Sequence, residues 1–431
     1  MASSAFKVPG AISAPDATSG VRADEPSNDR PASLAERPAA SPGKDPIPLL
    51  ICFSHLRWDF VWQRPQHLLS RAARHYRVVV FEEPVFRPGA VPQLEATSGQ
   101  GGVTVVRPIL PAGLDGPAAI AAQRHLVDAL VAHEADGVPR LLWYYTPMAL
   151  AFTRHLASDV AVYDNMDELS LFRGASPELV ALEDELFRRV DLVFTGGMSL
   201  YEAKKGRHGN VRAYPSSIEF EHFAAARRDA FPEPADQAGI ARPRLGFFGV
   251  VDERMDVGLV ADLAALRPDW QFVMIGPVVK IDPASLPRRD NVHWLGSKTY
   301  AELPAYLANW DVGLMPFALN EATRFISPTK TPEFLAAGLP VVSTPIADVV
   351  RPYGQKGLVE IAATAGEVAE KIEALLRRPR RRWLTKVDRH LAQGSWDRTW
   401  SAMRRQLDGF LGTTPAPRRD SAAAAVKRAA P

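Results

Sequence analysis

Cysteine is almost missing from this sequence of 431 residues, in which Cys52 is the single example. One cysteine excludes a disulfide bond within the chain and a zinc site built on several thiolates. Cys52 stands inside an apolar run, which predicts a small, buried strand residue. The composition therefore favours a reducing compartment.

Long apolar runs are missing as well. No stretch approaches the roughly 18 residues that a membrane-spanning helix needs, and segment 1–20 has no apolar core typical of a secretory signal. Neither sign of charge is in excess, because 51 Lys and Arg oppose 49 Asp and Glu, and this balance gives no general argument for nucleic-acid binding. We expect a cytoplasmic protein, with peripheral contact at the inner face of the plasma membrane left open.

The sequence divides into two long blocks between short tails. Residues 1–46 and 412–431 lack any periodicity and are predicted to be disordered. In blocks 47–222 and 244–392, apolar strand-like runs alternate with helical patterns, and a polar, proline-rich linker is predicted at 223–243. Repeated β-α-β units predict an α/β fold with two Rossmann-like domains, each a parallel sheet covered on both faces. The cleft between the domains is the expected site, since ligands bind at the carboxyl ends of parallel strands.

The segment 327–343 carries the clearest chemistry and reads SPTKTPEFLAAGLPVVS. Backbone N–H groups at a helix N-terminus attract phosphate, and Lys330 adds a positive charge suited to a diphosphate. An ionised Glu333 can accept hydrogen bonds from both hydroxyls of a ribose. We expect a donor-binding loop made of Ser327, Thr329, Lys330, Thr331 and Glu333. A glutamate in a first helical turn is also favourable for the helix dipole alone, and this structural alternative stays open.

This segment resembles the donor-binding signature of the group 1 glycosyltransferases, family 4, in which seven residues separate two glutamates. Glu333 matches the second glutamate, whereas Phe325 stands at the position of the first and Glu321 is out of register. The stretch ANWDVGLMPF at 308–317 is similar to the strand that precedes the donor loop in that family. The resemblance implies a GT-B fold and a glycosyltransferase that uses a nucleotide-diphosphate sugar, with retention at the anomeric carbon.

The turn from Gly246 to Arg254 resembles the family's approach to the donor diphosphate, which implies donor contacts for Gly249 and Arg254. Its glycines do not form the G-x-G-x-x-G pattern, so nothing favours a nicotinamide cofactor. We find no convincing Asp-x-Asp motif in a loop expected to face the cleft. We therefore expect no metal and no cofactor, and a site without a metal ion neutralises the leaving diphosphate with cations and helix N-termini. That role is assigned to Lys330 and, with its register open, to Arg254.

In the first block, segments 53–71 and 162–172 resemble a subgroup from bacterial exopolysaccharide and teichuronic-acid-type pathways. This implies a glycan or lipid-linked acceptor and a part in cell-surface polysaccharide synthesis. Both segments follow a predicted strand and should face the cleft. The candidates for acceptor binding or proton handling are His55, Arg57, Asp59, Arg64, Asp164 and Asp167, with Asp164 in a catalytic role and Trp62 and Gln63 available to a sugar. Each can instead stabilise a loop, and Asp164 or Asp167 can pair with Arg57 or Arg64.

Two further features lie near the end of the chain. Residues 393–411 are amphipathic, and the resemblance implies a helix that crosses back to the first domain with Trp396 and Trp400 as buried anchors. The run Arg377–Trp383 reads RRPRRRW, with five arginines beside a tryptophan. It is typical of contact with anionic lipid head groups or of a solvated basic helix end, and both interpretations stay open.

Two other functions fit the same scaffold. A nucleotide-sugar epimerase would bind the same donor and need no acceptor. A non-catalytic protein that binds a nucleotide sugar or a glycan is kept open by Phe325, which replaces an expected glutamate. An NAD-dependent oxidoreductase is disfavoured by the missing glycine pattern.

Overall fold

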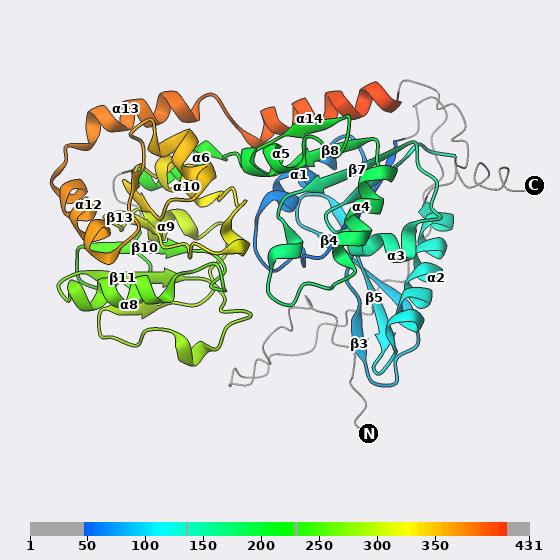
Figure 1. Ribbon diagram of the computed structural model, residues 1–431, viewed down its shortest axis with the longest axis horizontal. Helices are drawn as coiled ribbons and strands as arrows, with labels where there is room; N and C mark the ends of the chain where they lie inside the picture. The colour runs from blue at the N-terminus through cyan, green and yellow to red at the C-terminus, as the bar shows by residue number, and fades with distance from the viewer. Residues whose placement is uncertain (1–46, 135–136, 229–231, 412–431) are drawn as a thin grey trace, which may run out of the picture.

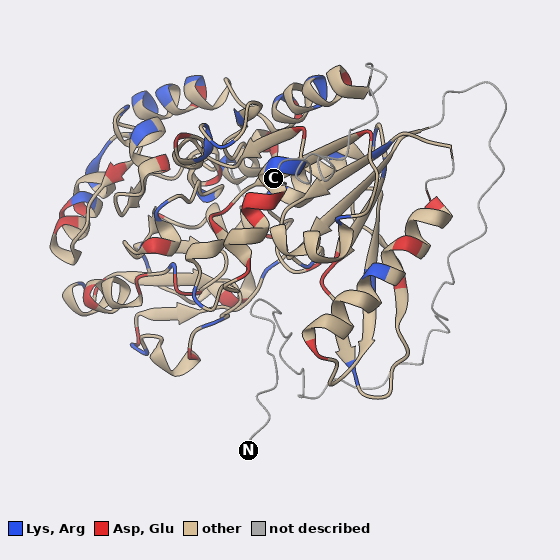
Figure 2. Cartoon of the chain, turned by 45° about the vertical axis from the view of Figure 1, so that its right-hand side comes forward, with Lys and Arg blue, Asp and Glu red and all other residues tan. Residues whose placement is uncertain are grey.

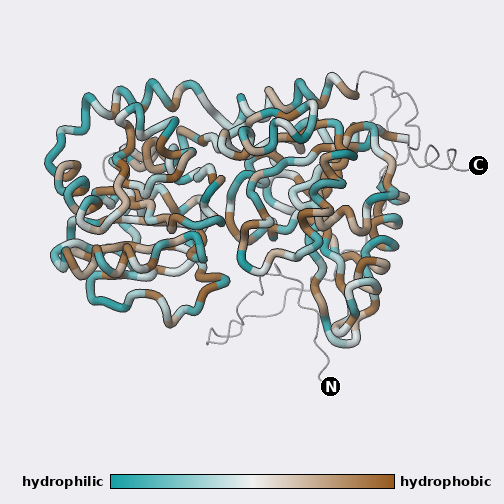
Figure 3. Tube along the Cα trace, viewed as in Figure 1, coloured by the Kyte–Doolittle hydropathy of each residue, from teal (hydrophilic) through white to brown (hydrophobic). Residues whose placement is uncertain are grey.

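The computed structural model describes residues 47–134, 137–228 and 232–411. Two α/β domains lie side by side, and two helices run along one edge across both of them (Figure 1). Hydrophobic residues colour the strands inside each domain, whereas the outer trace through residues 377–390 is mostly hydrophilic (Figure 3). The predicted tails, 1–46 and 412–431, lie outside the described residues.

The N-terminal domain is built on a nine-stranded sheet in the order β3-β5-β2-β1-β6-β7-β8-β9, with β4 paired to β5. All pairs are parallel except β4 with β5. The strands are β1 (Leu49–Ser54), β2 (Arg77–Glu82), β3 (Val85–Arg87), β4 (Gln93–Gly99), β5 (Val103–Pro111), β6 (Arg140–Tyr144), β7 (Val160–Asn165), β8 (Leu192–Thr195) and β9 (Val211–Ala213). Its helices are α1 (Arg64–Ala72), α2 (Gly116–Glu134), α3 (Leu150–Thr153), α4 (Leu179–Arg189) and α5 (Met198–Lys204).

Strand β1 shows why these segments become central strands. All six of its residues are buried. Leu49, Ile51 and Phe53 pack on one face of the sheet, whereas Leu50 and Cys52 pack on the other. A parallel sheet covered on both faces needs such a continuous apolar run. Cys52 is a buried free cysteine, as predicted.

The C-terminal domain is built on a six-stranded parallel sheet in the order β12-β11-β10-β13-β14-β15. The strands are β10 (Arg244–Phe248), β11 (Gln271–Ile275), β12 (Val292–Trp294), β13 (Val312–Met315), β14 (Val341–Ser343) and β15 (Glu360–Ile361). The helices of the second half are α6 (Phe220–Ala224), α7 (Ala235–Ala238), α8 (Val257–Leu266), α9 (Leu303–Leu307), α10 (Lys330–Ala336), α11 (Ala347–Val349), α12 (Ala365–Arg377), α13 (Arg380–Leu391) and α14 (Trp396–Leu411). The C-terminal sheet is parallel throughout, as the alternation predicts, and the N-terminal sheet is parallel except for the pair of β4 with β5.

Two local predictions differ from the structure. The pattern predicts a helix from Ser176 as N-cap, but α4 begins at Leu179, because a turn closed by the Leu179 N–H on the Ser176 carbonyl precedes it. Part of the predicted linker is folded, since Phe223 of α6 is fully buried in the core of the C-terminal domain, 6.2 Å from the ring of Phe248. The core of the C-terminal domain therefore includes residues that precede the predicted domain boundary at residue 244.

The chain returns to the first domain at its end, as predicted. Trp383 of α13 is buried in the core of the C-terminal domain. The next helix, α14, buries Trp396, Trp400, Met403 and Leu407 in the core of the N-terminal domain. The crossing between the domains therefore lies between α13 and α14, which follow one another along the upper edge in Figure 1.

Candidate active site

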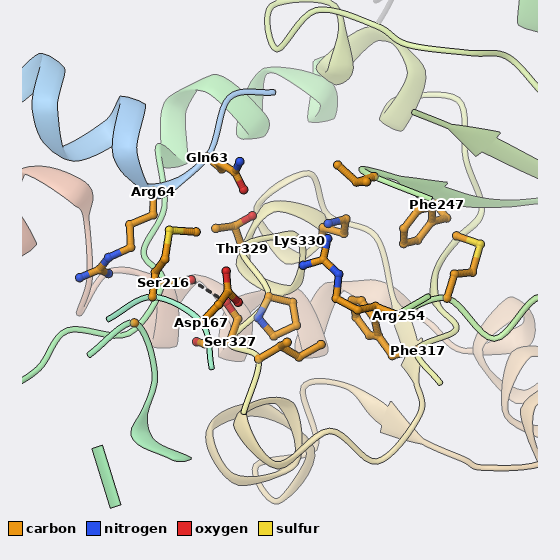
Figure 4. Close-up of a pocket in the computed structure, with 16 residues that line it drawn as sticks. Gln63, Arg64, Asp167, Ser216, Phe247, Arg254, Phe317, Ser327, Thr329 and Lys330 are labelled. Atoms are coloured by element: carbon orange, nitrogen blue, oxygen red, sulfur yellow. Dashed lines mark hydrogen bonds between the residues drawn. The ribbon is translucent and has the colours of Figure 1, made fainter. Parts of the chain in front are cut away.

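A pocket of about 100 Å³ lies between the two domains, at the carboxyl ends of their strands (Figure 4). Polar side chains from both domains line it, together with an apolar wall. The lining residues are Gln63, Arg64, Met166, Asp167, Gly196, Ser216, Phe247, Val250, Arg254, Met255, Phe317, Ile326, Ser327, Pro328, Thr329 and Lys330. This is where the sequence predicts a ligand site, between two parallel sheets.

The two domains touch at the rim of this pocket. The Ser216 hydroxyl donates to the Ser327 carbonyl at 2.6 Å, the dashed line in Figure 4. Asp348 of α11 accepts hydrogen bonds from the backbone N–H groups of Met198 and Ser199 at 2.8 and 3.0 Å. These contacts join the loop at Ser327 to Ser216, and α11 of the C-terminal domain to the N-terminus of α5 in the other domain.

Lys330 is the first residue of α10 and reaches into the pocket. It lies across Gly249, where an added Cβ would stand 2.2 Å from its Cε and 2.5 Å from its Nζ. Gly249 also has a φ of +125°, so a side chain is excluded there by backbone conformation and by space. Burial, followed by the charge of Arg254, lowers the pKa of Lys330 to about 8. Among the described residues, no carboxylate lies within ion-pair distance of Lys330, so its charge is available to a ligand.

Arg254 meets Lys330 in the same pocket (Figure 4). Its guanidinium donates to both oxygens of Asp252, at 2.7 to 3.1 Å. The carboxylate fixes the orientation of Arg254 and offsets part of its charge. Two cations that approach each other at a buried site favour an anionic ligand between them.

Glu333 lies one helical turn after Lys330 but does not line the pocket. It is 4% exposed, and its Oε2 atom has no hydrogen-bond partner in the described residues. Burial raises the pKa of Glu333 to about 7, against the opposing effect of Lys330. The hydroxyl of Tyr300 is similarly buried without a partner, and the charge of Glu333 acts on it. An orphaned buried carboxylate is costly unless a ligand group completes it.

Arg64 lines the pocket from the N-terminal domain and is held in place by two partners. It donates to both oxygens of Asp164 at 2.8 to 3.1 Å and to the Tyr214 carbonyl at 2.6 Å. Asp164 is fully buried at the end of β7 and does not line the pocket. This placement corrects the expectation that Asp164 faces the cleft, whereas the alternative of a pair with Arg64 is what the structure shows. Asp167 does line the pocket, and burial raises its pKa.

The other predicted site residues also divide into those that line the pocket and those that do not. Ser327 and Thr329 line the pocket, but Thr331 is fully buried, with its hydroxyl 3.5 Å from the Met315 sulfur, which corrects its assignment as a donor contact. His55, Arg57 and Asp59 lie outside the pocket.

His55, Arg57 and Asp59 lie in three different environments outside the pocket. Burial, followed by the charge of Lys280, lowers the pKa of His55 to about 4, and its Nδ1 atom has no partner in the described part of the chain. Arg57 holds a loop by donating to Glu82 at 3.1 Å and to the Glu83 carbonyl at 2.6 Å. Asp59 is exposed. The acceptor-side assignments of His55, Arg57 and Asp59 stay predictions.

The sequence did not single out the apolar wall of the pocket. Phe247, Phe317 and Ile326 line it, and each follows or ends a strand or loop that was predicted for other reasons. Trp62, considered as a sugar platform, instead packs on Tyr300 of the other domain with ring centres 5.8 Å apart. The position of a residue near the end of a predicted strand is the one signal that could have found these side chains.

Comparison with known proteins identifies the second half of the chain. The family model described as "Glycosyl transferases group 1" matches residues 242–378, which contain Gly249, Arg254, Lys330 and Glu333. The C-terminal domain is a group 1 glycosyltransferase domain. Its match supports the resemblance drawn from the segment 327–343 and places the donor loop inside the family's own region.

A relative of this chain is TuaH of Bacillus subtilis (strain 168). Its name gives it as a glycosyltransferase of teichuronic acid biosynthesis. The two sequences are 29% identical over 237 residues, which make up 51% of this chain and 59% of TuaH. The chain thus spans about three fifths of the length of that relative.

Solved structures similar to this one show the same two-domain GT-B fold. Sucrose-phosphate synthase from Thermosynechococcus elongatus has a TM-score of 0.63 at 15% identity, with 85% of this chain and 100% of that chain covered. HepE from Anabaena, solved with UDP and glucose, has a TM-score of 0.59 at 15% identity, with 83% and 99% covered. A trehalose-6-phosphate protein from E. coli, bound with UDP-2-fluoro glucose, has a TM-score of 0.59 at 14% identity, with 85% and 100% covered.

Two kinds of feature are absent from residues 47–134, 137–228 and 232–411. These residues contain no group of three or more His, Cys, Asp or Glu side chains arranged to hold a metal ion. None of their helices combines the length and the apolar character needed to cross a bilayer.

Proposed function

We propose that the chain transfers a sugar from a nucleotide-diphosphate donor to a glycan or lipid-linked acceptor, in the synthesis of a cell-surface polysaccharide. The group 1 glycosyltransferase domain and the name of TuaH support this class of reaction. UDP or a UDP-sugar in the structures of HepE and the E. coli protein supports a nucleotide-sugar donor.

The observation that carries the proposal is the position of Lys330. Its ammonium group lies over a glycine that could not be any other residue, beside Arg254, and no carboxylate of the described residues pairs with it. A leaving diphosphate placed there would be stabilised by both cations and by the N–H groups that begin α10. The two charges act most strongly on the departing group, where negative charge develops.

Glu333 completes the donor site in this proposal. Its free Oε2 atom would accept a hydrogen bond from a ribose hydroxyl, which would also satisfy the buried carboxylate. The mechanism needs no metal ion in this account, and retention would follow from attack on the face that the diphosphate leaves. Asp167 and Gln63, which enter the pocket from the N-terminal domain, are placed to position the acceptor hydroxyl.

A thermal-shift panel of UDP-, GDP- and ADP-sugars, with and without EDTA, tests the donor site. We expect one nucleotide family to raise Tm, with the chelator making no difference. Lys330→Met should weaken that donor about 10- to 100-fold, since hydrogen bonds to charged groups contribute about 1.5–3 kcal/mol. Lys205→Met, at an exposed position of the other domain, is the matched control and should bind normally. Equal affinity in the two variants would remove the donor assignment.

Product analysis separates the alternative functions. A transferase forms a glycosylated product only when acceptor is added, whereas a nucleotide-sugar epimerase converts the donor alone. A donor that binds and is never converted or hydrolysed would indicate a non-catalytic binding protein. Anomeric analysis of the product by NMR tests retention, and inverted product would refute that part of the proposal.

A further inference from the structure

Helix α13 exposes a row of cations on the side away from the domain core. Arg381, Arg382, Lys386 and Arg389 are all exposed, and we call these four residues the basic stripe. The opposite side of the helix buries Trp383, Val387 and Leu391. Lys386 lies four residues from Arg382 and three from Arg389, so these side chains share one face of the helix. In Figure 2, Lys and Arg recur on successive turns of this helix at the upper left.

The tryptophan of the predicted lipid-binding run is not part of this surface. Trp383 is 4% exposed, and its indole N–H donates to the Leu358 carbonyl at 3.1 Å. Arg380 is exposed but is engaged within the protein, because it donates to the Asp311 carbonyl at 2.8 Å. The run Arg377–Trp383 therefore does not act as a unit, and its tryptophan cannot insert into a bilayer.

The basic stripe is not neutralised from within the protein. None of its four residues has an ion pair among the described residues. The acids of the two edge helices are each engaged elsewhere: Asp388 with Arg227 at 2.8 Å, Asp397 with Arg71 at 3.1 Å, and Asp408 with Arg404 at 3.5 Å. The positive charge of the stripe therefore faces solvent.

Local helix stability does not account for the arginines at the start of α13. Arg380, Arg381 and Arg382 fill the first turn of α13, which contains no acidic residue. A helix N-terminus carries a partial positive charge, so cations there are unfavourable, and Arg382 and Lys386 repel each other across one turn. Arg389 lies in the last turn of α13 and Arg377 in the last turn of α12, where a cation is favourable, so the helix dipole opposes only the cations at the start of α13. Residues that oppose a local rule are most often retained for binding.

We propose that the basic stripe docks the protein on an anionic membrane surface. Clusters of four to eight Lys and Arg on an amphipathic helix bind anionic lipids through charge alone. No large apolar residue is exposed on α13 or α14 within the described chain, so the contact is electrostatic and does not penetrate the bilayer. Single-stranded nucleic acid fits less well, because such sites add exposed aromatic side chains for stacking, and the one tryptophan of α13 is buried.

Vesicle co-sedimentation of the full chain tests this proposal. We expect binding to phosphatidylcholine vesicles that contain phosphatidylglycerol, no binding to phosphatidylcholine alone, and release by raised salt. Arg381→Glu/Arg382→Glu should weaken binding by more than about 30-fold, because each basic residue near such a surface contributes about fivefold. The same variant should unfold at an equal or higher Tm, since glutamate suits the first turn of a helix.

Two controls make the result specific. Arg124→Glu/Arg188→Glu makes the same change of charge at exposed positions of α2 and α4 and should bind as the parent does. Lys386→Gln/Arg389→Gln, away from the helix start, should lose binding even if the first variant folds poorly. Equal binding by parent and stripe variants, or binding to neutral vesicles, would overturn the proposal. So would stripe-dependent binding to an oligonucleotide without binding to vesicles. The assay needs no donor, so its failure leaves the transferase proposal untouched.

Discussion

Replacement of Glu333 by Gln should stabilise the fold while it weakens donor binding. Burial raises the pKa of Glu333 from 4.5 to about 7, so the folded state resists ionisation of this carboxyl. At 1.36 kcal/mol per pKa unit, the ionised carboxylate costs the folded state about 3 kcal/mol. Glutamine keeps the size of the side chain and removes the charge.

The pH dependence follows from the same pKa. Well below pH 4.5, the carboxyl is protonated in both the folded and the unfolded state, and the substitution should change little. Between pH 4.5 and 7 the unfolded chain ionises before the folded one, so the parent protein loses stability as pH rises. The gain from Glu333→Gln should therefore appear across this window and stay constant above it. Since about 1 kcal/mol moves Tm by about 2–4 °C in a domain of 150–250 residues, the variant should unfold several degrees higher above pH 7.

Thermal unfolding by circular dichroism across this pH window, followed by donor titration, is the assay. Donor affinity should fall about 10- to 100-fold, the range for a lost hydrogen bond to a charged group. Glu370→Gln, at an exposed position of α12, is the control and should shift neither Tm nor donor affinity. A Tm difference that does not change with pH would refute the raised pKa of Glu333. Unchanged donor affinity would refute its role in donor binding.

Three further changes test other parts of the structure. Gly249→Ala should lower the free energy of unfolding by about 1–3 kcal/mol, because the φ of Gly249 is +125°, and should also displace Lys330. Urea unfolding and donor titration should therefore both change. Gly206→Ala is the control and should change neither, because nothing lies within 4 Å of the added Cβ. Donor affinity should fall as pH rises through about 8, where Lys330 loses its proton, and Lys330→Arg should abolish this fall. If the affinity of the variant fell over the same pH range, Lys330 would be excluded as the cause. Asp164→Asn should lower the free energy of unfolding by about 3–5 kcal/mol, because Arg64 would be left buried without its counter-ion. If urea unfolding showed a smaller loss of stability than an exposed Asp→Asn change causes, the pairing would be contradicted.

The sequence was sufficient for elements whose own pattern decides them. Helix α8 occupies the predicted range Val257–Leu266, since its apolar spacing and the Asp256 cap agree. Strand β4 was not predicted, because Gln93–Gly99 is mostly exposed and gives no apolar signal. Helix α13 was not predicted, because its first turn consists of arginines, which are unfavourable at a helix N-terminus.

The site shows the same division. Lys330 and Gly249 were predicted from a motif, because both depend on one local loop and the start of one helix. The directions of Thr331 and Asp164 depend on which face of an element packs against the rest of the protein, and no local pattern contains that information. The start of a helix matters too: proline favours the first helical turn, which predicts a start at Pro332, but α10 begins at Lys330 and so includes Thr331, which is buried.

The return of α14 to the first domain has a consequence for how the chain is made. Trp58, Trp143 and Phe194 share their cluster with Trp396 and Trp400, so the N-terminal core is completed by residues that are translated after the whole second sheet. A nascent chain that has already finished its second sheet still carries an open apolar groove on its first, which is a surface prone to aggregation. An isolated N-terminal domain should accordingly need α14 joined to it by a linker, and a protein cut after α13 should expose that groove permanently.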